Sequence, residues 1–446
     1  MEVLNQRGSL ATVFTKLATV AAVAAIAAIG LSGCGKNSSQ STVSSVRVLN
    51  IAPEAGAISI SAFINGATTA TNFQSGIAYK ATSGYTDVTS GAQSFQISNA
   101  GGVITTTPTA FSLSVVSQQK QLLVVFGGAT TTSAAFLNND QSNVASTNAR
   151  VRVANYMVGL GTFDVYVVGS AVDYNTVSPT IATGTGIYDV AIGSYQVILT
   201  SPGTKDIVLR VPARQLDAQQ VYNLGLFNAG SGELPSAFWL KQNDDTGTPE
   251  FINSTISRIR SVNSQSTVAS TNVNVNGALL FTNVTYGTAS NFEKTSSGAK
   301  TIVYSDAGNP PSTNTYTLNA TFDGATDYST FLSINPADNS ISAFSIADKI
   351  FPPKGTNIRV RLVNATTIPN LALSIGNKPL TGLTATRAAS AYFETTGGLG
   401  TTVSVSRDTA ATAVISETKD LTAGGSYSII VSGTLASPAI LTKLDK

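Results

Sequence analysis

The chain of 446 residues contains no histidine, one cysteine and one tryptophan. Histidine is the commonest general base and a usual zinc ligand, so its absence removes every Ser-His and Cys-His dyad. A single cysteine forms neither a disulfide within the chain nor a cluster of thiolate metal ligands. We therefore expect no enzyme, no metal site and no cofactor.

Charge is also scarce, because only 11% of the residues are Asp, Glu, Lys or Arg, less than half of the usual ~25%. The 26 basic and 24 acidic residues nearly balance and form no basic run, which argues against a nucleic-acid partner. No Walker loop or other nucleotide fingerprint appears, so we expect no nucleotide ligand. Hydrophobic residues make up 42% of the chain, which is enough for packed cores whose surfaces are coated by Ser, Thr, Asn, Gln and Gly.

The N-terminus has the composition of an export signal. Arg7 and Lys16 precede a run of fifteen residues without charge, Leu17 to Leu31. A basic start, an apolar stretch of this length and small residues behind it are typical of a secretory signal peptide. A membrane-spanning helix needs about 20 apolar residues, so the run is short for a permanent anchor.

The only cysteine ends this run. The residues Leu31, Ser32, Gly33 and Cys34 resemble the bacterial lipobox. The resemblance implies cleavage before Cys34, a diacylglycerol on its sulfur and acylation of the new amine. It thus predicts a signal peptide over 1–33, and a lipidated Cys34 with a flexible polar tether over 34–45. Gly35 in place of Asp implies sorting to the outer membrane if the organism is Gram-negative.

The remainder of the chain repeats. Four motifs, V-R-V-L-N, V-R-V-A-N, I-R-S-V-N and V-R-L-V-N, place arginines at intervals of 105, 108 and 101 residues. The repeated residues are Arg47, Asn50, Arg152, Asn155, Arg260, Asn263, Arg361 and Asn364. Each motif is followed by a short strand ending in Gly, by further strands, and by a strongly apolar strand near the end of the unit.

Period-two alternation, turns rich in Gly, Asn and Ser, and the lack of helical periodicity predict antiparallel sheets with one solvated face. The expected fold is all-β, with four tandem Ig-like antiparallel β-sandwich domains after the signal peptide. The predicted sandwiches cover 46–141, 150–245, 257–349 and 358–446. We expect them to follow one another as a rod, joined by polar linkers such as 243–250 and 351–357.

The first two copies carry a resemblance to a known family. The segments V-R-V-L-N-I-A-P-E-A-G-A-I-S-I-S-A-F-I-N-G (46–66) and V-R-V-A-N-Y-M-V-G-L-G-T-F-D-V-Y-V-V-G (151–169) resemble the bacterial family called domain of unknown function 4397. The family's frequent histidine is replaced by Asn in every copy. The resemblance implies an Ig-like sandwich and an exported or anchored location, without established chemistry.

Each repeated residue has a structural and a functional interpretation. We expect the arginine to pair with an acid or carbonyls of its own module, the alternative being a basic stripe that faces a ligand. The asparagine is expected to close a turn by bonding backbone amides. Acids near 138–140, near 243–245 and at Asp323 and Asp327 are interpreted as solvated turns, although calcium between modules stays open. Trp239 is expected in a core.

These observations predict a non-enzymatic lipoprotein of the cell envelope. It would be exported and held on the membrane by its lipid, with a structural, adhesive or binding role toward an unidentified envelope protein or glycan. A glycan-binding accessory protein is the alternative and would need a cluster of exposed aromatic residues. A hydrolase would need two acids 5–10 Å apart in a cleft. The sequence leaves open whether the chain faces the periplasm or the exterior, and whether copies assemble.

Overall fold

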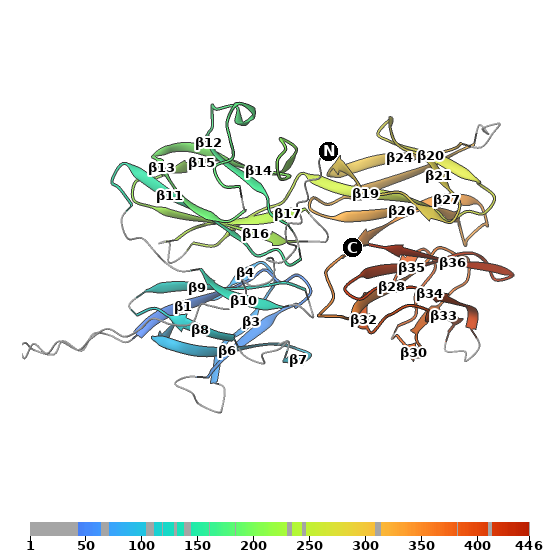
Figure 1. Cartoon of the computed structure of the whole chain (residues 1–446), viewed down its shortest axis with the longest axis horizontal. Coiled ribbons are helices and arrows are strands. Elements are labelled where there is room, and N and C mark those ends of the chain that lie inside the picture. The colour runs from blue at the N-terminus through green and yellow to red at the C-terminus, as the bar shows by residue number, and fades with distance from the viewer. Residues whose placement is uncertain are drawn as a thin grey trace, which may run out of the picture. The chain divides into compact units, whose positions relative to one another are not determined.

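A computed structural model of the chain describes residues 43–63, 71–103, 111–117, 119–128, 132–137, 144–159, 161–182, 184–229, 234–242, 247–307, 314–380, 382–408 and 413–445. Within these ranges the fold is all β, and the strands form four two-sheet sandwiches (Figure 1). No α-helix occurs in the described ranges, and the one helical turn there is η2 (Tyr174–Thr176). The predicted tandem β-sandwich fold is therefore confirmed.

We call the sandwiches modules 1 to 4. Module 1 contains β1 (Val43–Asn50), β2 (Ile58–Phe63), β3 (Thr71–Ile77), β4 (Ala81–Thr82), β5 (Thr86–Thr89), β6 (Gly91–Asn99), β7 (Gly102–Val103), β8 (Phe111–Val115), β9 (Lys120–Phe126) and β10 (Ser133–Leu137). Module 2 contains β11 (Asn148–Asn155), β12 (Asp164–Gly169), β13 (Gly186–Ala191), β14 (Gly193–Thr200), β15 (Ile207–Leu216), β16 (Val221–Asn228), β17 (Pro235–Lys241) and β18 (Glu250–Ile252).

The other two modules have the same order of elements. Module 3 contains β19 (Ile256–Asn263), β20 (Ser270–Val275), β21 (Ala278–Thr285), β22 (Thr288–Ala289), β23 (Glu293–Ser296), β24 (Gly298–Asp306), β25 (Thr315–Phe322), β26 (Asp327–Ile334) and β27 (Ile341–Asp348). Module 4 contains β28 (Ile358–Asn364), β29 (Leu371–Ile375), β30 (Lys378–Pro379), β31 (Ala388–Ala389), β32 (Phe393–Thr395), β33 (Thr401–Arg407), β34 (Ala413–Lys419), β35 (Ser426–Thr434) and β36 (Ser437–Leu444).

One sheet of each module is built around the strand that carries the V-R-V-type motif, and we call it the first-strand sheet. In module 1 its order is β10-β9-β1 followed by β4 and β5, and the second sheet is built from β3, β2, β6, β7 and β8. The first strand pairs in parallel with the strongly apolar strand near the end of its module, as in β1 with β9 and β28 with β35. Each sandwich thus contains one parallel ladder within an otherwise antiparallel arrangement.

Each core lies between the two sheets of its module. In module 1, Val46 and Val48 of β1 point inward and pack with Ile58, Ile60 and Phe95 of the second sheet, and all five are fully buried. The equivalent first strands of the other modules do the same with their own second sheets. Alternation along β1 therefore places Arg47 and Leu49 on the opposite face, away from the core of module 1.

Several observed boundaries differ from the predicted ones. Residues 43–45, expected in the flexible tether, form the start of β1, where Val43, Ser44 and Ser45 pair with β5. Module 2 continues to β18, which pairs with β17 beyond the predicted end at residue 245. The cause is the same in both cases, because polar residues at a module's edge satisfy their backbone groups by joining a neighbouring strand.

In every module, a side-chain hydrogen bond fixes the turn before the strand that pairs in parallel with the first strand. The Tyr222, Tyr328 and Tyr427 hydroxyls accept the backbone N–H of the residue five positions earlier, at 3.1, 3.0 and 2.7 Å. Gln121 takes this place in module 1, where its Oε1 accepts the Val116 N–H at 2.9 Å. The spacing resembles the tyrosine corner of Ig-type sandwiches. The hydrogen bond attaches the turn to the strand that forms the parallel ladder with the first strand.

Buried tyrosines make the fold sensitive to alkali. Burial raises the pKa of Tyr304 from 10.0 to about 12, and it also raises the pKa of Tyr79, Tyr156 and Tyr392. The neutral phenols therefore stabilise the folded chain fully below pH 10, and this contribution is lost as the pH rises through the folded pKa values. We expect part of the phenolate absorbance at 295 nm to appear only together with unfolding, followed by circular dichroism. Ionisation of all fourteen tyrosines before any loss of β structure would contradict this expectation.

Candidate functional site

The four repeated asparagines close turns at the ends of the first strands. The Oδ1 atoms of Asn50, Asn155, Asn263 and Asn364 accept the backbone N–H two residues later, at 3.0, 2.9, 3.1 and 3.1 Å. In modules 1, 3 and 4 the side-chain nitrogen also donates to two carbonyls of the same module, as Asn364 does to Ile368 and Thr384. This is the turn-closing role expected from the sequence, and it leaves these side chains occupied within the fold.

The four repeated arginines are all buried, and three of them, Arg47, Arg260 and Arg361, contact groups of another module. Relative exposures are 3% for Arg47, 9% for Arg152, 0% for Arg260 and 2% for Arg361. We predicted pairing within each module or a basic stripe open to a ligand. Arg260 does pair with an acid of its own module, Asp348, at 3.6 Å. In addition, Arg47 donates to the Gly247 carbonyl near the end of module 2 at 2.9 Å, and the arginines of modules 3 and 4 reach acids across the boundary between those modules.

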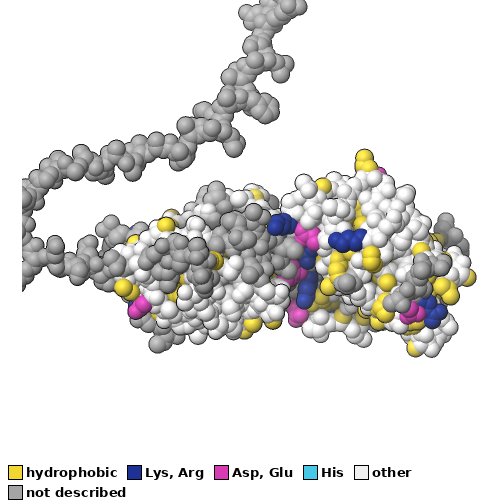
Figure 2. Space-filling view, turned by 90° about the horizontal axis from the view of Figure 1, so that it is seen from below, with side chains coloured by type: hydrophobic (Ala, Val, Ile, Leu, Met, Phe, Trp, Pro, Cys, Tyr) yellow, Lys and Arg dark blue, Asp and Glu magenta, His cyan; other side chains and the backbone are white. Residues whose placement is uncertain are grey.

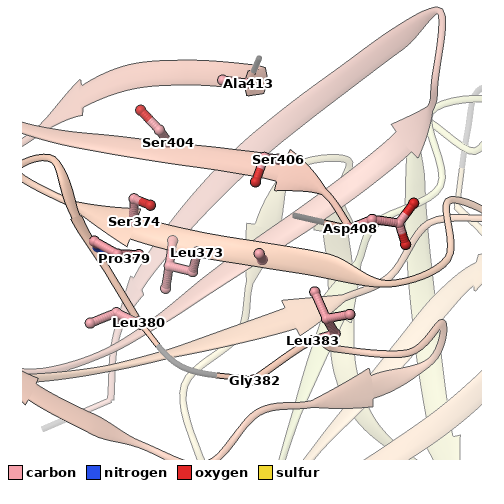
Figure 3. A pocket seen from close by; sticks show the side chains of 11 residues that line it. Leu373, Ser374, Pro379, Leu380, Gly382, Leu383, Ser404, Ser406, Asp408 and Ala413 are labelled. Atoms are coloured by element: carbon pink, nitrogen blue, oxygen red, sulfur yellow. The ribbon is translucent and has the colours of Figure 1, made fainter. Parts of the chain in front are cut away.

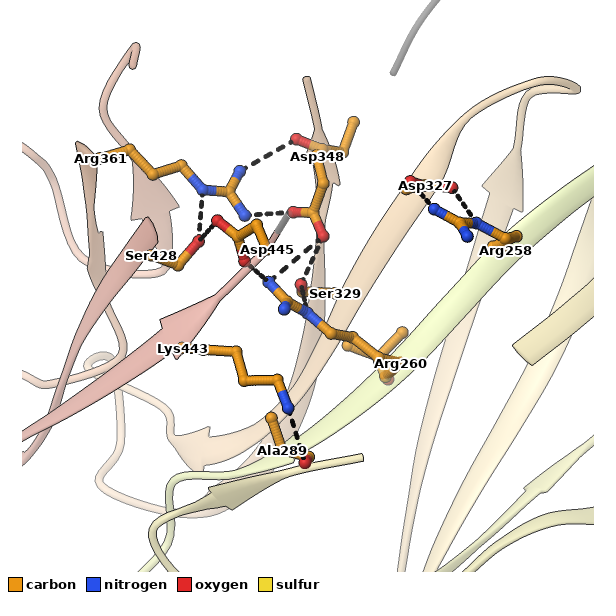
Figure 4. Close-up of polar contacts among 12 residues, drawn as sticks. Arg258, Arg260, Ala289, Asp327, Ser329, Asp348, Arg361, Ser428, Lys443 and Asp445 are labelled. Carbon is orange, nitrogen blue, oxygen red and sulfur yellow. Dashed lines mark hydrogen bonds and ion pairs between the residues drawn. The ribbon is translucent and has the colours of Figure 1, made fainter. Parts of the chain in front are cut away.

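Modules 3 and 4 exchange these arginines reciprocally (Figure 4). Arg260 of module 3 binds Asp445, which follows the last strand of module 4, at 2.6 Å, and Arg361 of module 4 binds Asp348 at the end of β27. Each aspartate also accepts a serine hydroxyl from its own module, Ser329 to Asp348 at 2.6 Å and Ser428 to Asp445 at 2.7 Å. We call these two arginines, two aspartates and two serines the arginine–aspartate clasp.

The two positive and two negative charges of the clasp balance, although the clasp lies out of water and Arg260 Nη1 has no hydrogen-bond partner there. The side chains of its arginines and aspartates are at most 2% exposed. Burial alone lowers the pKa of Arg361, but attraction by Asp348, Tyr392 and Asp445 outweighs it and raises the pKa. The pKa of Arg260 is raised in the same way, against burial, by Asp445 and Asp348. Both guanidinium groups therefore remain charged within the boundary.

A short motif that the sequence analysis did not identify supports each arginine in modules 1, 3 and 4. It reads Ser-x-aromatic, at 83–85, 290–292 and 390–392. Tyr85, Phe292 and Tyr392 lie over Arg47, Arg260 and Arg361, with 5.1, 4.7 and 4.9 Å from the guanidinium carbon to the ring centre. Cation–π contacts of this kind stabilise a desolvated guanidinium. The recurrence of Ser-x-Tyr or Ser-x-Phe in phase with the arginines was the signal available in the sequence.

The boundary between modules 1 and 2 is mostly apolar. Outward-facing residues of both first-strand sheets form one buried cluster: Leu49, Ile51, Leu122, Val124, Leu137, Tyr156, Phe227, Phe238 and Leu240. Gln242 stands where modules 3 and 4 have their aspartates, and its Oε1 accepts the Asn223 side chain at 3.1 Å. The sequence predicted solvated outer faces for the sheets, and this prediction is wrong for the first-strand sheets because each covers a neighbour.

Module pairing also explains the low charge of the chain. When both faces of the first-strand sheets are buried, less surface needs ionic groups. On the described part of the face in Figure 2, charged side chains are few, and backbone and uncharged side chains cover most of the rest. A further contact joins modules 1 and 4, where Glu54 and Arg359 form an ion pair at 2.9 Å. A linear rod in which modules touch only their chain neighbours lacks such a contact, so the predicted rod is wrong in this respect.

A hollow lies on the outer face of the second sheet of module 4 (Figure 3). Its volume is about 470 Å³, and it is lined by Ser374, Ser404, Ser406, Asp408, Leu380 and Leu383, among others. The serines offer hydroxyl hydrogen bonds, and Ser404 already bonds Ser416 at 2.8 Å. No lysine stands among the described residues that line the hollow, and the chain has no histidine.

The acids considered for calcium are engaged in the fold where the structure describes them. Asp327 binds Arg258 at 2.6 Å, and Asp323 Oδ2 accepts the Tyr328 hydroxyl. Among the described ranges no group of three metal-ligating side chains occurs. Residues 138–140 and 243–245 lie outside the described residues.

Two further expectations concern Trp239 and the N-terminus. Trp239 is 8% exposed and stacks on Tyr222 in the core of module 2, with 5.5 Å between ring centres, so the core prediction is confirmed. The signal peptide, the lipobox residues Leu31, Ser32 and Gly33, Cys34 and the tether up to residue 42 lie outside the described residues. Within the described part of the chain, no helix has the length and apolar character needed to cross a membrane.

Comparisons with known proteins agree with the repeated architecture. A model of the family described as Domain of unknown function (DUF4397) matches residues 44–166 and 257–374, together more than half of the chain. Each match starts in the first strand of one module and ends in the second strand of the next, β12 or β29. The matched unit is therefore longer than one sandwich.

The search of curated proteins finds no match to this chain. Among solved structures, the Bacillus anthracis TIE protein is 9% identical, with 85% of this chain and 68% of that chain covered and a TM-score of 0.17. The two matched regions lie in different halves of the sequence and include the motifs that begin all four modules. The chain belongs to the family described as Domain of unknown function (DUF4397).

Proposed function

We propose that this chain is a non-enzymatic lipoprotein of the bacterial cell envelope. In this proposal a lipid on Cys34 holds a set of paired β-sandwiches at the membrane, where they play a structural, adhesive or binding role. The observation that carries the proposal is the single cysteine in Leu31-Ser32-Gly33-Cys34, directly after fifteen uncharged residues. Gly35 favours the outer membrane, with the modules facing the periplasm or the exterior.

Lipidation accounts both for the single cysteine and for the polar segment that follows it. A thioether-linked lipid removes the only thiol from oxidation during export. Each buried methylene contributes about 0.8 kcal/mol, and stable anchoring takes more than one acyl chain. Residues 35–42, G-K-N-S-S-Q-S-T, contain one charge and no apolar run, which suits a spacer between the lipid and β1.

The described residues favour neither a glycan-binding accessory protein nor a hydrolase. Tyr188 is the only aromatic side chain among the exposed large hydrophobic residues of the described ranges, so no aromatic platform for a glycan forms there. Two acids that share one arginine partner, Asp348 and Asp445, are buried and bound to arginines. A hydrolase would need two carboxyl groups facing a cleft.

Mass spectrometry of the mature N-terminus tests the proposal. We expect the wild-type chain to begin at a Cys34 that carries acyl groups and to partition with membranes, whereas Cys34→Ala should remain unprocessed and lack the lipid mass. Ser32→Ala is the matched control, because a small residue is retained next to Gly33 and processing should continue. An unmodified Cys34 in the wild type would refute the anchor.

Protease treatment of intact cells then separates the two possible faces. Loss of the modules from intact cells would place them on the exterior, and the search for a partner would turn to extracellular proteins and glycans. Protection in intact cells combined with digestion after the outer membrane is opened would place them in the periplasm.

A further inference from the structure

The first-strand sheets end on one side at an edge that is interrupted in three of the four modules. In module 1 this edge consists of β4 and β5, in module 3 of β22 and β23, and in module 4 of β31 and β32. At each interruption a serine side chain replaces the backbone acceptor. Ser83, Ser290 and Ser390 accept the N–H of Val48, Ser261 and Leu362 at 2.9, 2.9 and 3.0 Å. Short, broken edges of this kind discourage pairing with another chain.

Module 2 lacks this interruption. Its edge strand β13 pairs with β11 through six consecutive residues, from Gly186 opposite Val153 to Ala191 opposite Asn148. Thr185 stands where the other modules have the serine and Ile187 where they have the aromatic residue, yet the pairing with β11 continues through Gly186 and Ile187 without a break. Module 2 therefore presents one continuous strand at the edge where modules 1, 3 and 4 present two short ones.

The edge of β13 is apolar, exposed and without net charge. Ile187 is 55% exposed, Tyr188 42%, and Ile192, directly after the strand, 52%. The one charged residue of β13, Asp189, is neutralised by Arg150 of β11 through two bonds at 2.7 and 2.9 Å. Exposed edges are normally protected by a free charge or a proline, and β13 has neither.

The backbone of β13 has hydrogen-bonding groups directed outward. Ile192 donates its N–H to Thr147 at 3.0 Å, so the alternate residues Tyr188 and Val190 also direct their backbone groups toward β11. Ile187, Asp189 and Ala191 then direct theirs away from the sheet, because β13 has a neighbour on one side only. Three successive outward residues are enough to template another strand.

We propose that β13 is a docking edge for a second copy of this chain, and that two β13 strands pair antiparallel about a twofold axis to join two five-stranded sheets. The register that aligns the outward groups places Tyr188 opposite Tyr188 of the second copy, and Ile187 opposite its Asp189. No like charges then face each other, because each Asp189 lies opposite an isoleucine and is neutralised by Arg150 of its own copy.

The strand's own sequence favours a second copy over a foreign peptide. When G-I-Y-D-V-A pairs with a second copy of itself about Tyr188, tyrosine faces tyrosine on one side of the sheet. On the other side Ile187 faces Asp189, whose charge Arg150 neutralises. Since the core-facing residues of both strands fall on the same side, the cores of the two modules become continuous. The inference does not depend on the lipid, and it is tested without it.

Cross-linking tests the register. In a detergent-solubilised full chain carrying Cys34→Ala, an introduced cysteine is the only thiol. Tyr188→Cys should form a disulfide-linked dimer under mild oxidation, because directly opposite residues of a non-hydrogen-bonded pair have Cβ atoms close to the separation that a disulfide needs. Glu293→Cys is the matched control, since Glu293 holds the same position opposite β19 on the interrupted edge of module 3. It should remain monomeric.

A charge substitution tests the contact without a covalent bond. Ile187→Glu places a carboxylate opposite Arg152 within its own sheet, which the monomer tolerates, and opposite Asp189 of the second copy, which repels it. We expect light scattering to show a concentration-dependent dimer for the Cys34→Ala chain, and a dimer dissociation constant raised at least about tenfold for Ile187→Glu. A monomer at all concentrations with Tyr188→Cys unlinked, or equal cross-linking of Glu293→Cys, would overturn the proposal.

Discussion

Asp348→Ala is expected to destabilise modules 3 and 4 by about 3–5 kcal/mol, the usual cost of removing one partner from a buried ion pair. Asp348 binds Arg361 and accepts the Ser329 hydroxyl, and its side chain is 0% exposed. Its removal leaves the Arg361 guanidinium in a dry boundary without its acid. Hydrogen exchange in β19 and β28 should accelerate sharply, while the Trp239 fluorescence transition, which reports on module 2, should move little.

Two variants make this result specific to the clasp. Glu417→Ala removes a surface partner of Lys419 in the same module and should change stability by less than about 1 kcal/mol. The double variant Asp348→Ala with Arg361→Met removes both charges and should recover much of the loss, because an apolar side chain has no desolvation cost. Equal destabilisation by Asp348→Ala and Glu417→Ala would contradict the role assigned to the clasp.

Gly225→Ala is expected to open the boundary between modules 1 and 2 at a cost of about 2–3 kcal/mol. Gly225 of β16 lies opposite Phe238 of β17, and a Cβ added at Gly225 would lie 2.0 Å from the Phe238 ring. Phe238 is fully buried in the apolar cluster shared with Leu49 and stacks on Tyr156, with 6.1 Å between ring centres. The ring cannot move without leaving that cluster.

The measurement uses the position of the only tryptophan. Trp239 follows Phe238 directly and points into the core of module 2, so urea unfolding monitored by its fluorescence reports on this boundary. Gly398→Ala, where nothing lies within 4 Å of the added Cβ, should leave the transition unchanged. Combining Gly225→Ala with Phe238→Leu should restore part of the stability. An unchanged transition in Gly225→Ala alone would show that the ring is not held over the glycine.

Local pattern was sufficient to predict the sandwiches. The spacing of Arg47, Arg152, Arg260 and Arg361 marked the four first strands, and the asparagines marked the turns after them. These features depend on residues within a few positions of one another, so each repeat carries them in readable form. The inward alternation of Val46 and Val48 likewise identified the core face of β1.

The pairing of modules was not predictable from such patterns. Arg260 and Asp445 are 185 positions apart, and nothing near either residue identifies the other. Leu49 and Val124 are apolar residues on the face opposite the core of module 1. The prediction of a single sandwich with a solvated outer face gave no reason for apolar residues there. The bonds from Tyr222, Tyr328 and Tyr427 to backbone groups five positions earlier depend on the path of the turn, which strand periodicity does not specify.

The reciprocal exchange of arginines limits how chains of this kind change length. Deletion of module 3 or module 4 would leave the arginine of the remaining module without its aspartate from the other. Deletion of module 1 or module 2 would expose the apolar cluster at their boundary. We therefore expect a pair of sandwiches to be the smallest part of the chain that folds by itself. The family match agrees with this, because each matched region is longer than one module and the second begins two modules after the first. Relatives with an even number of sandwiches should accordingly outnumber those with an odd number, and truncations for the laboratory should separate the chain near residues 253–255 rather than within a pair.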